Sequence, residues 1–274
     1  MKIRFTKMSG AGNDFVVLGP EFGGLKSRLS WLAKRVCPRK ISVGADGLIL
    51  VEHDGQGLFM HYFNSDGSAA SFCGNGARCL VRYCLEKGLA RGEVSFRSAS
   101  GIHTGEVTPD GVRIGVKMPV LVRRARIGVE GGPGGRATYD ILLIDAGVPH
   151  AVVFVTDLAA VEVESVGRVI RYHPDVGPEG ANVDFVDARG SGPSGIRTYE
   201  RGVEAETLAC GSGCVAAALA LELERGAGEK VQLMVASGDV LTVELASAAK
   251  RAALSGPAAM VFEGEIDIKE LDHV

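Results

Sequence analysis

Two segments of the chain carry the hydrophobic spacing of a buried helix, and each starts next to a glycine-rich turn. In residues 77–88 (ARCLVRYCLEKG) the apolar side chains are spaced to share one helical face, and Gly88 ends the pattern. In residues 214–226 (CVAAALALELERG) strong helix formers run up to Gly226. We therefore predict one central helix in each half of the chain.

Short apolar runs rich in β-branched residues lie on both sides of each predicted helix, and they predict strands. These runs lie at Asp14–Leu18, Gly47–Glu52, Val94–Phe96, Val112–Met118, Ala151–Val155, Ile196–Glu200, Val231–Val235 and Val240–Leu245. Each half is then a small, mostly antiparallel sheet or barrel wrapped around one apolar helix. The expected fold class is α+β.

The two halves repeat a pattern at a constant offset. SFCGNGARC around Cys73 and LACGSGCVA around Cys210 lie 137 residues apart, half of the 274-residue chain. An Ala-Ser-Gly turn at 99–101 recurs at 236–238 with the same offset. The same offset relates a polar residue near the start of each half, since Asn13 corresponds to His150.

Three features at one offset indicate an internal duplication into two similar domains. We expect an N-terminal domain over residues 1–118 and a C-terminal domain over 119–264. The boundary falls near Met118-Pro119. The last strand, about residues 265–274, could join the first domain.

Composition and charge narrow the class of protein. Thirty basic and 33 acidic residues give a net charge of -3, which offers no reason to expect nucleic acid or an anionic membrane as a partner. No apolar run reaches the roughly 18 residues of a spanning helix, and the start, MKIRFTKMSG, lacks the apolar core of a signal peptide. A cytoplasmic protein is expected. The basic cluster Arg123-Arg124-Ala125-Arg126 is expected in a solvated connection.

In that compartment the six cysteines are expected to be reduced thiols. Four of them are expected to be small buried packing residues: Cys37, Cys79, Cys84 and Cys214. There is no Cys-x-x-Cys pair, and Cys210-x3-Cys214 stands without a second pair of ligands. We therefore expect neither a thioredoxin-like activity nor a metal site.

The other two cysteines, Cys73 and Cys210, each lie in a glycine turn before a helix. Free N–H groups and the helix dipole make such a turn an anion site, and the same field lowers the pKa of a thiol there. Two such turns on either side of one bound anion suit stereoinversion at a carbon that carries a carboxylate. One thiolate removes the α-proton and the other thiol protonates the opposite face. The scheme needs no metal and no organic cofactor.

Three stretches resemble the diaminopimelate epimerase family, a pyridoxal-independent, two-thiol group: KMSGAGNDFVVL, FNSDGSAASFCGNGARC and YERGVEAETLACGSG. The likeness runs from Lys7 to about Gly264. It implies a small-molecule substrate, 2,6-diaminopimelate, whose LL and meso isomers are interconverted for lysine and peptidoglycan precursor synthesis. It also implies that no cofactor is used. A homodimer is compatible with the resemblance, and the sequence itself does not fix the oligomeric state.

The resemblance assigns roles residue by residue. Cys73 and Cys210 correspond to the two catalytic thiols, and His150 and Glu200 to residues that tune them. The positions that correspond to substrate-binding residues are Asn13, Asn64, Gly74, Asn75, Asn182, Glu200, Arg201, Gly211 and Ser212. Of these, Arg201 suits the distal carboxylate and Glu200 the distal ammonium of the substrate.

Two departures from the family pattern keep other functions open. Gly47 follows Asp46 where the family often has glutamine, and Val148 replaces an asparagine that contacts the substrate. The alternatives are a racemase of another amino acid in the same superfamily and a non-catalytic amino-acid binding protein. Optical inversion of a panel of amino acids separates the first, and ligand binding without deuterium incorporation identifies the second.

Overall fold

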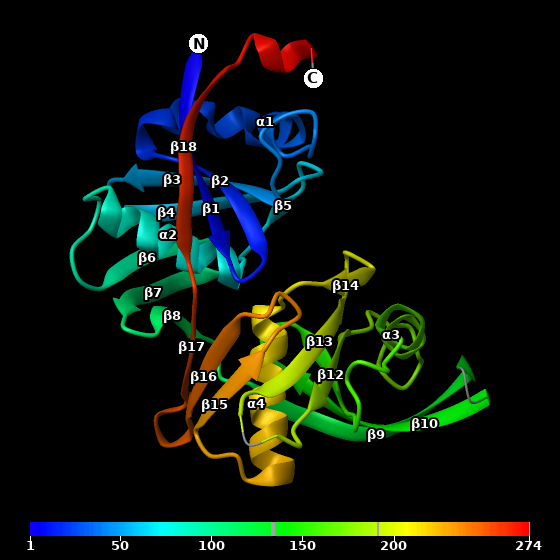
Figure 1. Cartoon of the computed structure of the whole chain (residues 1–274). Helices are drawn as coiled ribbons and strands as arrows, with labels where there is room; N and C mark the ends of the chain where they lie inside the picture. Colours follow the sequence, from blue (N-terminus) through cyan, green and yellow to red (C-terminus); the bar gives the residue numbers. More distant parts are fainter. Residues whose placement is uncertain (133–134, 191, 274) are drawn as a thin grey trace. The chain divides into compact units, whose positions relative to one another are not determined.

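The computed structural model describes residues 1–132, 135–190 and 192–273. The chain divides into two compact units (Figure 1). One consists of Met1–Gly115 together with Gly256–Val274, and the other of Val116–Ser255. The end of the chain therefore belongs to the same unit as its beginning.

The first unit contains most of the N-terminal half and the last strand. Its elements are β1 (Lys2–Gly10), β2 (Asn13–Leu18), η1 (Pro20–Arg28), α1 (Leu29–Val36), β3 (Gly47–Asp54), β4 (Gly57–Asn64), β5 (Ala69–Ala70), α2 (Gly74–Glu86), β6 (Val94–Ser98), β7 (Gly101–Thr108), β8 (Gly111–Val116), β18 (Ala259–Asp267) and η3 (Glu270–His273).

The second unit contains the rest of the chain. Its elements are β9 (Val120–Gly132), β10 (Gly135–Asp145), β11 (Pro149–Phe154), α3 (Val163–Arg171), β12 (Asn182–Asp187), β13 (Ser194–Glu200), β14 (Ala205–Thr207), α4 (Gly211–Arg225), β15 (Lys230–Met234), β16 (Val240–Ala246), η2 (Ser247–Ala249) and β17 (Arg251–Gly256).

The two units share one order of strand pairing. In the first, β1–β2 is antiparallel, β2–β3 parallel, β3–β4 antiparallel and β4–β6 parallel. In the second, β10–β11, β11–β12, β12–β13 and β13–β15 follow the same alternation. A central helix follows the short strand β5 or β14 in each unit. The α+β fold and the duplication predicted from the sequence are confirmed.

Each central helix is buried on nearly all sides, as its apolar composition requires. In α2 the buried residues run from Asn75 to Val81 and include Tyr83 and Cys84, and in α4 they include every residue from Gly213 to Ala218. Figure 1 shows α2 beside the strands of the first unit and α4 beside those of the second. The two predicted helices are present, and Gly226 ends α4 in the left-handed conformation that favours glycine.

A second helix covers the other face of each sheet. Leu29, Leu32 and Val36 of α1 pack with side chains of β2 and β3, and Val163, Val166 and Ile170 of α3 pack with side chains of β11 and β12. Strands covered on both faces are apolar at consecutive positions rather than alternating. This explains runs such as residues 15–18 and 48–51, which are wholly buried.

The basic cluster of residues 123–126 lies in β9 and not in a loop, so that expectation was wrong. Strand β9 pairs with β10, and its arginines are held by neighbouring acceptors. Arg126 bonds Asp140 at 2.6 Å, and Arg124 bonds Glu224 at 2.5 Å. The Arg126 pair joins β9 to β10 and the Arg124 pair joins β9 to α4, and exposed ion pairs of this kind let a basic segment serve as a strand.

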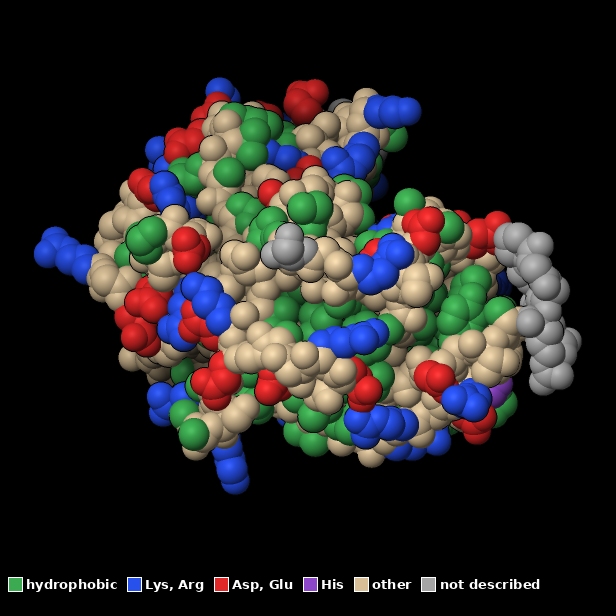
Figure 2. Space-filling view, turned by 60° about the horizontal axis from the view of Figure 1, so that its bottom comes forward, with side chains coloured by type: hydrophobic (Ala, Val, Ile, Leu, Met, Phe, Trp, Pro, Cys, Tyr) green, Lys and Arg blue, Asp and Glu red, His purple; other side chains and the backbone are tan. Residues whose placement is uncertain are grey.

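Charged side chains of both signs are interspersed on the face drawn in Figure 2. This agrees with the small net charge of -3. Among the helices in the described ranges, none is long and apolar enough to cross a membrane.

Candidate active-site residues

Cys73 caps the N-terminus of helix α2. Its backbone is extended, with φ -141° and ψ 117°, and its sulfur accepts a hydrogen bond from the N–H of Gly76 at 3.4 Å. A side chain at position 76 would be crowded, because a Cβ there would lie 3.1 Å from the terminal carbons of Ile49 and Met60. The glycine therefore lets the helix start close against the sheet, with a half-buried thiol at its mouth.

Asn75, in the first turn of α2, joins two other polar side chains. Its amide nitrogen donates to Oδ1 of Asn13 at 2.6 Å, and its Oδ1 accepts from Nη2 of Arg78 at 2.8 Å. Asn13 in turn donates to Oδ2 of Asp46 at 3.1 Å. Asn75 is 3% exposed and Arg78 is fully buried. Two candidate residues from separate elements, Asn13 and Asn75, are thus in direct contact.

Asn64, by contrast, is bonded within its own turn. Its amide donates to the hydroxyl of Ser68 at 2.9 Å, and its backbone N–H donates to the carbonyl of Ser68. It lies opposite Gly47 in the β3–β4 pairing.

The space beside Gly47 is occupied by Tyr62. A Cβ at position 47 would lie 2.5 Å from the ring of Tyr62 and 2.8 Å from the carbonyl oxygen of Phe63. The Tyr62 ring also makes an edge contact with Phe15, at 6.0 Å between ring centroids. Tyr62 therefore takes the volume that a longer residue at position 47 would need.

Cys210 caps helix α4 in the equivalent place, with φ -114° and ψ 108°. Its sulfur lies 3.5 Å from the hydroxyl of Ser212, and the residue is 7% exposed. Burial raises the pKa of this thiol well above its ordinary value, and the nearby carboxylates of Glu200 and Asp184 raise it further. In this environment Cys210 is a protonated thiol at neutral pH, so the lowered pKa expected for a thiol at a helix mouth is wrong for this residue.

His150 is fully buried and is held from both ring nitrogens. Its Nδ1 lies 2.7 Å from Oδ2 of Asp184, and its Nε2 lies 3.3 Å from the amide nitrogen of Asn182. The Asn182 oxygen already accepts the backbone N–H of Arg201 at 2.8 Å, so the amide nitrogen is the group that faces the ring. Nε2 therefore accepts, and Nδ1–H donates to Asp184.

Glu200 and Arg201 lie at the end of β13 and beyond it. Burial raises the pKa of Glu200. The guanidinium of Arg201 is only 3.6 Å from the carboxylate of Glu179, whose side chain is 82% exposed. An ion pair this exposed contributes little to stability, so Arg201 can exchange Glu179 for a bound carboxylate.

Three residues of these networks were absent from the candidates chosen from the sequence: Asp46, which is partly exposed, and the fully buried Arg78 and Asp184. Arg78 interrupts an apolar helix three residues after Asn75, a spacing that places both on one helical side. Asp184 also accepts the hydroxyl of Thr198 at 2.8 Å, and its oxygen would lie 2.4 Å from a Cβ on Gly213. For Asp184, the signal in the sequence was a polar residue at a strand position that faces inward.

The remaining cysteines are packing residues, as expected. Cys37, Cys79, Cys84 and Cys214 are at most 1% exposed, and burial raises the pKa of the first three to about 12. None of the six cysteines, all within the described ranges, forms a disulfide. In the described part of the chain, no group of three or more His, Cys, Asp or Glu side chains is arranged to hold a metal ion.

Known proteins share both this sequence pattern and this fold. The diaminopimelate epimerase profile matches residues 5–122 and 142–261, which spans both repeats. Diaminopimelate epimerase of Aquifex aeolicus is 37% identical over 284 residues, covering 99% of this chain and all of the relative.

Two solved structures match at lower identity. A PhzF-family phenazine biosynthesis protein of Bacillus anthracis has a TM-score of 0.76 at 14% identity, covering 98% of this chain and all of the other. A hydroxyproline epimerase of Agrobacterium vitis, solved with trans-4-hydroxy-L-proline, has a TM-score of 0.68 at 16% identity, covering 97% and 93%.

The fold and the sequence matches together define an isomerase of the amino-acid racemase and epimerase class. More particularly, the chain belongs to the diaminopimelate epimerase family.

Proposed function

We propose that this protein interconverts LL- and meso-2,6-diaminopimelate without a cofactor, using Cys73 and Cys210 as the two acid–base groups. The observation that carries the proposal is the repeated helix mouth: each unit caps its central helix with a cysteine inside a glycine turn. Membership of the diaminopimelate epimerase family supports the substrate. The reaction supplies a precursor for lysine and peptidoglycan.

In the proposed step, the substrate α-carboxylate is held by the turns at Gly74-Asn75 and Gly211-Ser212. Helix N-termini suit this task, because their N–H groups and dipole favour negative charge. They also stabilise the charge that develops on the carboxylate when the α-proton leaves. The proton passes to one thiolate, and the other thiol returns a proton to the opposite face.

The starting protonation states follow from the two environments. The pKa of Cys210 is raised, first by burial and then by Glu200 and Asp184, so we assign it as the proton donor of the free enzyme. Cys73 is half-buried and accepts an N–H bond from Gly76, and we assign it as the initial base. One turnover exchanges the two states, and a turnover in the reverse direction restores them.

The distal end of the substrate is assigned to Glu200 and Arg201. Arg201 has an exchangeable partner in Glu179, so its guanidinium can take the distal carboxylate. Asn182 supports this placement, since its oxygen binds the Arg201 backbone while its amide faces His150. A substrate whose distal end carries a carboxylate and an ammonium group can pair with Arg201 and Glu200, respectively.

Solvent deuterium exchange at the α-carbon tests the proposal. The purified protein in D2O, with no added cofactor, is expected to incorporate deuterium into diaminopimelate while its optical configuration inverts. Parallel reactions contain lysine, proline and trans-4-hydroxyproline. Faster inversion of one of these would identify a racemase of another amino acid, and binding of diaminopimelate without any exchange would identify a binding protein.

We propose further that the protein is a cytoplasmic homodimer. Six free thiols suit a reducing compartment. Strand β18 carries Val261 and Phe262, which are 57% and 49% exposed, and such apolar strands mark contact surfaces. Analytical ultracentrifugation of the wild type and of Val261→Asp tests the contact: a dimer that the substitution leaves intact would contradict it.

A further inference from the structure

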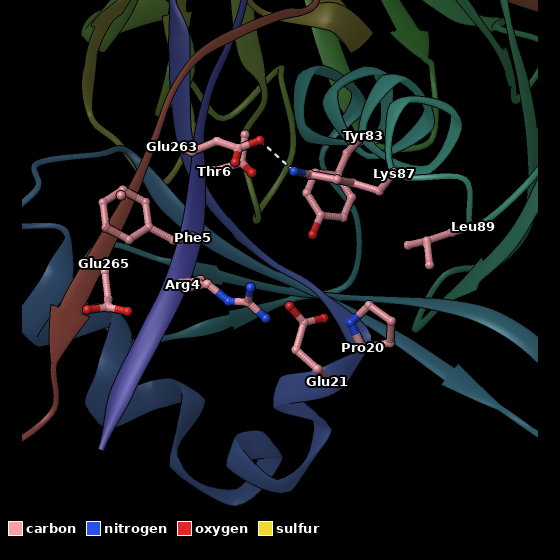
Figure 3. Close-up of a pocket in the computed structure, with 11 residues that line it drawn as sticks. Arg4, Phe5, Thr6, Pro20, Glu21, Tyr83, Lys87, Leu89, Glu263 and Glu265 are labelled. Atoms are coloured by element: carbon pink, nitrogen blue, oxygen red, sulfur yellow. Dashed lines mark hydrogen bonds and ion pairs between the residues drawn. The ribbon is translucent and has the colours of Figure 1, made fainter.

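A cavity of about 610 Å³ lies in the first unit, where helix α2 ends (Figure 3). Its walls come from β1, β18, the start of η1 and the last turn of α2. Helix α2 stops at Glu86, and the chain leaves it at Gly88, whose φ is +68°. The outer end of the β1–β18 pair is therefore left uncovered on this face.

Three of the charged residues in the cavity wall already have ion-pair partners. Lys87 bonds Glu263 at 2.5 Å, and Glu265 bonds Lys2 at 2.6 Å. Besides the hydroxyl of Thr6, three polar groups remain: the guanidinium of Arg4, the carboxylate of Glu21 and the hydroxyl of Tyr83. Within the residues that the structure describes, none of these three has a hydrogen bond or ion pair. Figure 3 shows Arg4 and Glu21 pointing toward one another across the cavity.

Tyr83 forms the buried side of this group. The residue is 5% exposed, and its hydroxyl points into the cavity in Figure 3. A Cβ at Gly19 would lie 2.2 Å from Oε2 of Glu21 and 2.8 Å from the Tyr83 hydroxyl. Both oxygens therefore converge over the same glycine. Burial raises the pKa of Tyr83 to about 12, with Glu21 contributing, so the group stays a neutral hydroxyl.

The three free groups define the charge pattern of a ligand. Arg4 offers a cation that binds carboxylates in a bidentate manner, while Glu21 and the Tyr83 oxygen offer acceptors for an ammonium group. One positive and one negative charge remain unpaired, which matches a molecule that is itself a zwitterion. The apolar side chains of Phe5, Pro20 and Leu89 complete the wall and suit an uncharged aliphatic group.

We propose that this cavity is a binding site for a small zwitterionic α-amino acid with an aliphatic side chain. The carboxylate lies on Arg4, the ammonium on Glu21 and Tyr83, and the side chain against Leu89 and Pro20. The site is separate from the thiol at the mouth of α2, because Tyr83 follows Cys73 by ten residues, about 15 Å along a helix. It does not depend on the proposed epimerase reaction.

Isothermal titration calorimetry of the full-length protein with L-leucine at low ionic strength tests the site. Saturable binding is expected, and it should persist in saturating meso-diaminopimelate. Arg4→Gln should weaken binding about tenfold or more, since it removes a charge-assisted pair. Tyr83→Phe should weaken it severalfold and serves as the second variant. Arg251→Gln, an exposed arginine of the second unit, is the matched control and should bind as the wild type does.

Two truncated ligands test the charge pattern. Isocaproate lacks the ammonium and isopentylamine lacks the carboxylate, so each should bind at least tenfold more weakly than leucine. The proposal is overturned if leucine shows no saturable binding or if diaminopimelate displaces it. Equal binding to the wild type and Arg4→Gln, or binding of isocaproate as tight as that of leucine, would also overturn it.

Discussion

Asp184 and His150 form a pair that is closed to solvent: Oδ2 and Nδ1 are 2.7 Å apart, and both side chains are 0% exposed. Strands β11 and β12 bring them together, because His150 pairs with Asn182 in a parallel register and Asp184 follows two residues later on the same face. The pair fixes the imidazole so that its other nitrogen meets Asn182. The buried carboxylate of Asp184 thus fixes the position of the His150 imidazole, one of the candidate site residues.

Replacing Asp184 with asparagine is expected to destabilise the protein. The substitution removes the negative acceptor of the His150 and Thr198 donors inside the fold, and about 1–3 kcal/mol of unfolding free energy should be lost. Urea denaturation measures this. Asp187→Asn on the same strand is the control, because its partner Arg189 is exposed and little should change. Equal stability of Asp184→Asn and the wild type would refute the role given to the pair.

Glu200→Gln is expected to lower the pKa of Cys210. After burial, the Glu200 carboxylate is the largest cause that raises it, so removing the charge makes the thiolate easier to form. The pH profile of Cys210 alkylation by iodoacetamide, followed by mass spectrometry, should move to lower pH. Glu224→Gln at the far end of α4 removes the same charge and should leave the profile unchanged. A profile that does not move in Glu200→Gln contradicts the assignment.

Glu200 is also expected to make the folding stability depend on pH. Because burial raises its pKa in the folded state above the unfolded value of about 4.5, the folded protein holds a proton that the unfolded chain releases. Its contribution to stability is therefore lost as the pH rises from about 4.5 through the folded pKa. Denaturation measured across this range should show a smaller decline in Glu200→Gln than in the wild type.

Gly47→Ala is expected to destabilise the first unit by about 1–3 kcal/mol, because the new Cβ meets the Tyr62 ring and the Phe63 carbonyl. Adding Tyr62→Leu should recover part of the loss, since it removes one of the two obstacles, and the effects should be non-additive. Gly115→Ala is the control, with nothing closer than 3.6 Å to its Cβ. Strict additivity would show that Tyr62 does not fill this space.

Asn75 and Asn64 should separate substrate binding from stability. Both are proposed to bind substrate, yet only Asn75 is buried within a network. Asn75→Ala should raise KM and lower unfolding free energy by about 1–3 kcal/mol. Asn64→Ala should raise KM with little loss of stability, because its amide bonds the exposed Ser68 within its own turn. Steady-state kinetics and urea denaturation of both variants check this contrast.

Much of the fold was predictable because the strongest signals are local. Each of the eight predicted strands overlaps an observed one, and both central helices follow their glycine turns. Strand β1 was missed: buried Lys7, which is paired with Asp14 at 2.6 Å, breaks its apolar pattern. A last strand was expected at about residues 265–274, but β18 spans Ala259–Asp267, because it is set by pairing with β1 at the other end of the chain.

The site residues were predictable where the residue type and the local turn sequence together indicate a role, as for Cys73 and Cys210 in their glycine turns. It was not predictable where a side chain is defined only by distant partners. Arg78 binds Asn75 on its own helix, but its backbone acceptor, the carbonyl of Pro257, lies 179 residues away. The ring of Tyr62 occupies space left by the glycine at position 47 across the strand pair. Such relationships need the strand register.

The central claim is that two thiols act on opposite faces of one α-carbon. The most direct measurement follows deuterium incorporation and epimerisation of diaminopimelate in D2O. The variants are Cys73→Ser and Cys210→Ser, and each is compared with the buried-cysteine control Cys84→Ser. Each catalytic variant is expected to lose epimerisation by several orders of magnitude, because serine is a far weaker acid than a thiol, while the control, if folded, keeps it. Full epimerisation by either variant would contradict the two-thiol account.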